Sequence, residues 1–146
     1  MTTRRGGRTG QVVVEMLLIL PVFLTMVFTI MEIGYVSFQL ILLNHATYEV
    51  ARIGSMTYSP PPGYTCGKLN EFMQKILPAA RVTCSEDATL TDPQAGNTNR
   101  DLVVTGQHAV RLIFPISSII MAKPKGSGTR LLLATVRMPI ETPLTK

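Results

Sequence analysis

The 146-residue sequence has no tryptophan and only two cysteines and two histidines. A zinc site takes about four Cys or His ligands, but the sequence has no C-x-x-C pair, and His45 and His108 fall in different predicted elements. Glycine-rich phosphate loops, G-x-S-x-G and H-E-x-x-H are also absent. We therefore predict that the chain is not an enzyme and has no catalytic residue, no metal site and no cofactor.

The few polar residues suited to acid-base chemistry do not form a recognisable site. No spacing fixes the geometry of the acids after the first half of the chain, which include Glu86, Asp92, Asp101 and Glu141. The two histidines are interpreted as ordinary surface or interfacial residues.

The net charge of +5 at first suggests a nucleic-acid partner. Arg4, Arg5 and Arg8 supply three of the positive charges, and the chain after residue 10 carries 11 basic and 9 acidic side chains, a net of +2. Four tyrosines, no tryptophan and no stripe of Arg and Lys leave no nucleic-acid footprint. We predict no nucleic-acid partner.

A long apolar run dominates the first third of the chain. From Val12 to Met31 the sequence reads VVVEMLLILPVFLTMVFTIM, which is long enough to cross a bilayer as a helix and contains one charged residue, Glu15. Basic residues precede it without acids, so the positive-inside rule places the N-terminus in the cytoplasm and the C-terminus outside. The run is too long for a cleaved secretory signal, and no A-x-A-like site follows it.

The helix is predicted to continue beyond the membrane as an amphipathic segment. One face carries Val36, Leu40, Leu43, Thr47, Val50 and Gly54, and the other Asn44, His45, Tyr48, Glu49 and Arg52. A helix from about Gln11 to Ile53 would be about 65 Å long, twice the membrane thickness, so its outer half must pack against something.

Glu15 has two interpretations. A carboxylate near the membrane surface can simply reach the interface. Alternatively, cleavage after Gly10 would create a positive amine at Gln11, which could neutralise the carboxylate of a neighbouring helix in a bundle. Glu15 would then direct assembly.

The pattern RTG-QVVVE before an apolar helix resembles the class III leader of type IV pilins, with Gly10 before the cut and Glu15 as fifth mature residue. The first third is similar to TadE-like minor pilins of tight adherence pili, which show G-x-x-x-x-E, a membrane helix ending near E-x-G, and an outer helix with Asn, Ala, Ala and Arg, here Asn44, Ala46, Ala51 and Arg52. The tail LLLATVRMPIE resembles the family's last strand. Two positions differ from the family pattern: Gln11 is the first mature residue, and Met16 stands where Tyr or Phe is usual.

The resemblance implies a minor pilin or pseudopilin anchored in the bacterial inner membrane, with a periplasmic C-terminal domain. Its implied partners are other pilins or pseudopilins, a prepilin peptidase that cuts between Gly10 and Gln11, and the pilus assembly platform. Whether the chain enters the filament is left open. The alternative is an unprocessed single-pass adaptor whose outer domain binds a secretion or envelope partner.

Pro21 lies inside the predicted membrane helix. Proline frees a backbone carbonyl, so it predicts a kink or a loosened turn. In pilins generally, such a turn lets the helix lengthen as a subunit leaves the bilayer, and we assign Pro21 to assembly on that basis.

The rest of the chain predicts a small α+β domain. The proposed divisions are a basic leader at 1–10, the long helix at 11–58 and an outer domain at 59–146. Within the outer domain we expect a stiff SPPPG linker at 59–63, a short helix ending near Pro78, strands at 81–85, 101–114 and 129–140, and an exposed loop at 86–100. The long helix should pack on this antiparallel sheet of about three strands.

Cys66 and Cys84 both lie in the part predicted to be outside the cytoplasm. Disulfides persist in that environment, and we predict a disulfide between them, in preference to two free buried thiols.

Overall fold

The fold is that of a computed structural model, which describes residues 8–58, 62–92, 97–114, 119, 121–122, 124–125 and 127–140. The elements, in chain order, are α1 (Arg8–Met56), α2 (Pro62–Ile76), β1 (Ala80–Asp92), β2 (Asn97–Arg111) and β3 (Thr129–Pro139). The predicted α+β class, with one long helix, one short helix and a three-stranded sheet, is confirmed.

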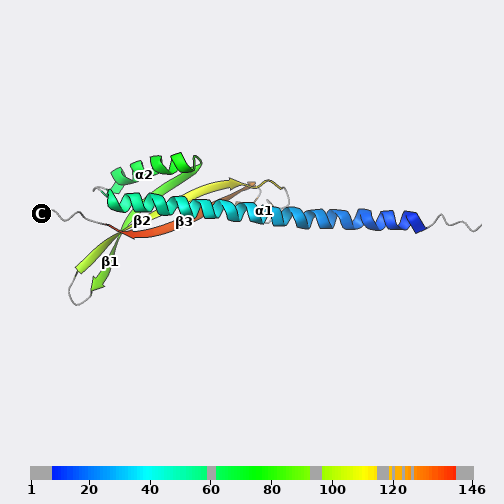
Figure 1. The fold of residues 1–146 in the computed structure, drawn as a ribbon, viewed down its shortest axis with the longest axis horizontal. Coiled ribbons are helices and arrows are strands. Elements are labelled where there is room, and N and C mark those ends of the chain that lie inside the picture. Colours follow the sequence, from blue (N-terminus) through cyan, green and yellow to red (C-terminus); the bar gives the residue numbers. More distant parts are fainter. Residues whose placement is uncertain are drawn as a thin grey trace, which may run out of the picture.

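The sheet is antiparallel throughout, with strand order β1-β2-β3. The C-terminal half of α1 contacts β2 and β3, while α2 contacts β1 and α1. In Figure 1 the N-terminal half of α1 extends away from this body without another element beside it. The fold is therefore a compact outer unit attached to a bare helical rod.

The core lies between the outer half of α1 and the sheet. Leu43, Thr47, Val50 and Gly54 of the predicted apolar face are buried, and the five predicted polar-face residues are exposed. Leu40 departs from the prediction, because its side chain is 37% exposed. Leu69 and Met73 of α2 and Leu102 and Val104 of β2 complete the centre of the core.

The helix α2 begins earlier than the sequence pattern predicted. We expected residues 59–63 to form a linker, but Pro62 and Gly63 belong to the first turn of α2, and 59–61 lie outside the described residues. A proline fits the first turn of a helix because the amide hydrogen it lacks would have no partner there. Pro62 therefore starts a helix.

The predicted exposed loop at 86–100 is wrong over most of its length. Residues 86–92 belong to β1 and 97–100 to β2, paired from Glu86↔Leu102 to Asp92↔Asn97, with an irregularity between Leu90 and Asp92. The two strand ends project from the body in Figure 1. The side chains described in this part of β1, those of Glu86, Asp87 and Ala88, are all exposed, so they show no alternation of buried and exposed positions that would mark a strand.

Gly106 allows α1 to approach the middle of the sheet closely. A Cβ atom at this position would collide with the Thr47 hydroxyl oxygen and would lie 3.3 Å from Leu43 Cδ1 and 3.4 Å from Met73 Cε. Thr47 cannot easily move aside, because its buried hydroxyl donates to the Leu43 carbonyl at 2.7 Å. A side chain here would push α1 away from β2.

We expect Gly106→Ala to lower the free energy of unfolding by about 1–3 kcal/mol, the usual cost of overpacking a core. Gly67 of α2 is the matched control, since a Cβ there meets nothing within 4 Å. Gly67→Ala should be neutral or stabilising, because alanine favours helix. Chemical denaturation of both variants, followed by circular dichroism, measures the difference, and equal stabilities would contradict the close-approach explanation.

Candidate functional site

The N-terminal half of α1 is apolar and uncovered. Its large side chains from Val12 to Met31 are mostly more than half exposed, as at Leu18 (71%) and Phe23 (59%). The stretch Gly10–Met56 contains an 18-residue window of mean hydropathy 2.4, none of it buried, and is long and apolar enough to cross a membrane. A core helix of a soluble protein would instead be largely covered by its own fold.

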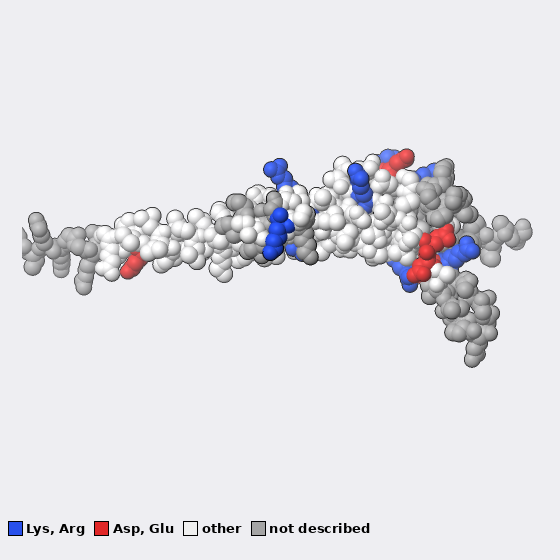
Figure 2. All heavy atoms as spheres, turned by 180° about the vertical axis from the view of Figure 1, so that it is seen from behind, with Lys and Arg blue, Asp and Glu red and all other residues white. Residues whose placement is uncertain are grey.

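The predicted cleavage residues lie at the start of this rod. Gly10 and Gln11 are both exposed and helical, and a Cβ at Gly10 would meet nothing within 4 Å. Glu15 is exposed one turn further along α1, and among the described residues it has no ion-pair partner. On the face drawn in Figure 2, the apolar half carries a single acidic patch.

Pro21 is accommodated without a break in α1, which runs continuously from Arg8 to Met56. The Thr25 hydroxyl donates to the Pro21 carbonyl at 2.7 Å, and the Thr29 hydroxyl donates to the Thr25 carbonyl at 2.8 Å. Figure 1 shows no sharp bend along this part of α1, so the kink is not seen in that view. Looser packing of the turn at Pro21 stays a prediction.

Glu32 is a residue whose role the sequence patterns did not reveal. Its side chain is fully buried. The carboxylate accepts two backbone hydrogen bonds, from Ile113 N to Oε1 at 3.0 Å and from Phe114 N to Oε2 at 3.2 Å. One helix residue therefore holds the chain that leaves β2. The available signal was its position as the only acid between Glu15 and Glu49.

An aromatic pair strengthens the same junction. The rings of Phe28 and Phe114 stack with centroids 4.8 Å apart and an interplanar angle of 16°. Phe28 precedes Glu32 by four residues, so both point from one side of α1. Ile113 and Phe114 thus lie beside the apolar half of α1 and its end.

The structure joins Cys66 of α2 to Cys84 of β1 in a disulfide, with their Cα atoms 5.7 Å apart. Both residues are half-buried and pack against the edge of the core. The link ties α2 to β1, an edge strand of the sheet.

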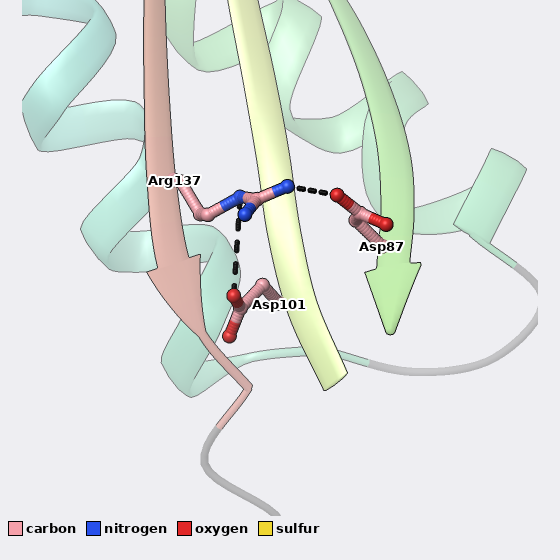
Figure 3. A network of polar contacts seen from close by, with 3 residues as sticks. All are labelled: Asp87, Asp101 and Arg137. Atoms are coloured by element: carbon pink, nitrogen blue, oxygen red, sulfur yellow. Dashed lines mark hydrogen bonds and ion pairs between the residues drawn. The ribbon is translucent and has the colours of Figure 1, made fainter. Parts of the chain in front are cut away.

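A charged network lies at the end of the sheet remote from the apolar rod. Arg137 of β3 forms an ion pair with Asp87 of β1, and its Nε lies 3.9 Å from Asp101 Oδ2 on β2 (Figure 3). Asp87 and Asp101 are direct cross-strand partners, so Arg137 offsets the repulsion between two adjacent carboxylates. The Arg137–Asp87 pair is exposed on both sides, and such pairs contribute about 0–1 kcal/mol, so the network suits a structural role.

The remaining polar candidates do not converge. His45 is exposed on α1, and His108 is half-buried on β2. Among the residues that the structure describes, no three His, Cys, Asp or Glu side chains are grouped as metal ligands. A hollow of about 460 Å³ between Ile53 of α1 and Phe72 of α2 is also lined by Lys68 and Glu71, and neither histidine lines it.

Comparison with known protein families gives one match. Residues 10–52 match the family described as "TadE-like protein". The match covers the apolar half of α1 and most of its outer half, and ends before α2. No curated protein and no solved structure matches the chain.

Proposed function

We propose, from the TadE-like character of residues 10–52, that the chain is a minor pilin-like component of a tight adherence pilus. The observation that carries this proposal is the bare apolar half of α1 within the matched region, directly followed by a folded outer domain. An anchored helix that presents a small domain is the architecture expected of a pilin-like subunit. The role is structural and not enzymatic.

The proposed location is the inner membrane. A run of twenty residues from Val12 to Met31 measures about 30 Å as a helix, the thickness of a hydrocarbon core. The arginines before it favour a cytoplasmic N-terminus, so the sheet would lie in the periplasm. The disulfide between Cys66 and Cys84 suits that oxidising compartment.

Assembly is proposed to depend on Glu15. Cleavage after Gly10 would leave the amine of Gln11 about 6 Å along the helix axis from Glu15, near the membrane surface. In a bundle of such helices, the amine of one subunit and the carboxylate of its neighbour would neutralise each other. The exposed position of Glu15, without an ion-pair partner among the described residues, leaves it accessible to another chain.

Processing tests the proposal most directly. Co-expression with the cognate prepilin peptidase should remove residues 1–10, because Gly10 is exposed and precedes Glu15 by five residues. Gly10→Leu should block the cut, whereas Gly7→Leu in the leader should leave it unchanged. Intact-mass measurement of the membrane protein reads the N-terminus in each case.

The same experiment separates the second candidate function. An unprocessed single-pass adaptor would also expose an apolar helix and carry a folded outer domain. An intact N-terminus in both the parent and the Gly10→Leu protein, with active peptidase present, would reject the pilin-like proposal and favour that adaptor.

A further inference from the structure

Residues 112–114, at the start of the connection from β2 to β3, are fixed against α1 by polar and apolar contacts. Glu32 accepts the backbone amides of Ile113 and Phe114, and Phe114 stacks on Phe28. Leu112 is buried beside them. These contacts fix the position of the first residues after β2 along the axis of α1.

Along the axis of α1, Phe114 lies level with a residue of the apolar run, Phe28. Phe28 lies three residues inside the run that ends at Met31, or about 4.5 Å along the axis. If α1 spans the inner membrane, the ring of Phe114 therefore lies at the interface between that membrane and the periplasm. Ile113, its neighbour in the chain, is exposed and must then meet lipid unless another protein covers it.

The side chains of the connection suit a membrane surface. Ile113 is 64% exposed and Ile119 is 71% exposed, although both are large and apolar. Arg111 and Lys125 are exposed nearby in the chain. Figure 2 shows basic side chains at the boundary between the apolar rod and the rest of the molecule. From Leu102 to Ile140 the sequence contains no acidic residue.

We propose that this connection docks onto the outer leaflet of the bilayer that α1 crosses, and that the leaflet carries anionic headgroups. Ile113 and Ile119 would enter the interface, while Arg111 and Lys125 contact lipid phosphates. Apolar side chains flanked by basic ones are the usual composition of segments that lie in the membrane surface. The inference rests on the proposed membrane anchor, and it adds a second point of membrane contact to α1.

Glu32 is the positioning residue for this contact. A carboxylate at the membrane boundary would be costly if it lacked partners. Here two backbone amides satisfy both of its oxygens, so it can be buried and hold the connection at the required height.

The absence of tryptophan provides a direct test. We propose three single-tryptophan variants of the full chain: Ile119→Trp in the connection, Leu20→Trp in the apolar run, and Ser85→Trp on β1 as the exposed control. Each is reconstituted at low protein density in vesicles of phosphatidylethanolamine and phosphatidylglycerol, with and without brominated acyl chains. Bromine quenches tryptophan emission only at close range.

Docking predicts a loss of emission for Ile119→Trp and Leu20→Trp in brominated vesicles, and none for Ser85→Trp. Quenching of Leu20→Trp alone would overturn the docking inference and leave the anchor intact, whereas quenching of neither would overturn both. Blue-shifted but unquenched emission from Ile119→Trp would show that protein covers the connection, which also rejects lipid docking.

Two further comparisons test the details. Replacing phosphatidylglycerol by phosphatidylcholine should reduce the quenching of Ile119→Trp but not of Leu20→Trp, and equal quenching would overturn the choice of an anionic leaflet. Adding Glu32→Ala to Ile119→Trp should also reduce quenching, while circular dichroism remains that of the folded protein. Unchanged quenching in a folded Glu32→Ala protein would reject Glu32 as the positioning residue.

Discussion

The Glu15→Gln protein should reach the membrane at normal levels and fail to support pilus assembly. Glutamine keeps the shape of the side chain but removes the charge. Insertion should therefore persist or improve slightly, because the desolvation cost of a charge is removed; this cost is about 2.5–3.5 kcal/mol at the bilayer centre and smaller near the interface. Glu15 is the only acid from Val12 to Met31, so the variant leaves no negative partner there for a new amine at Gln11. Membrane fractionation and pilus counts measure the two effects.

Glu49→Gln is the matched control for Glu15→Gln. Glu49 is also an exposed acid on α1, but it lies on the outer half, away from the apolar run. The control should assemble normally although it loses the same charge. If Glu15→Gln instead crosslinks to its partners and supports piliation like the parent, Glu15 is only an interfacial residue and charge pairing does not drive assembly.

Removal of the disulfide should produce the largest loss of stability in the outer domain. Cys66 and Cys84 are separated by 18 positions, and the chain-entropy estimate for a loop of that size is roughly 3 kcal/mol. The double variant Cys66→Ser/Cys84→Ser should lose about that much unfolding free energy. The domain has only three strands, two of them at edges, so a loss of this size is large relative to its reserve.

Denaturation under oxidising and reducing conditions distinguishes the crosslink from side-chain effects. The reduced parent protein should be about as unstable as the double variant, and reducing agent should not affect the variant further. A parent protein that unfolds identically with and without reducing agent, or that shows free thiols after isolation from its native envelope, would contradict the disulfide.

The main elements could be predicted because strong sequence periodicities mark them. The apolar run and the three- and four-residue spacing from Leu43 to Gly54 define α1, and runs rich in Val, Leu and Thr define β2 and β3. The extended ends of β1 and β2 could not be found in this way. The side chains that the structure describes there, at Glu86, Asp87, Ala88 and Arg100, are all exposed, so they lack the alternation of buried side chains that reveals a strand.

The junction at Glu32 was missed for a different reason. Its two hydrogen bonds join residues 81 and 82 positions apart, and their donors are backbone amides, which leave no residue-type signal. Glu15 presents the opposite case, since its position between an arginine-rich leader and an apolar run predicts a role directly. Long-range contacts to main-chain atoms are thus the part of the candidate site that sequence patterns cannot supply.

Because α1 is continuous, a tilt of its membrane-spanning part also moves the outer domain sideways. The described helix has no break between Arg8 and Met56, and about 37 Å of it extends beyond Met31. A membrane tilt of about 20°, which is ordinary for a spanning helix, would swing the far end of α1 sideways by roughly 13 Å. A change in the tilt of α1 within a bundle would therefore move the β1–β2 hairpin sideways above the membrane by a distance of that order.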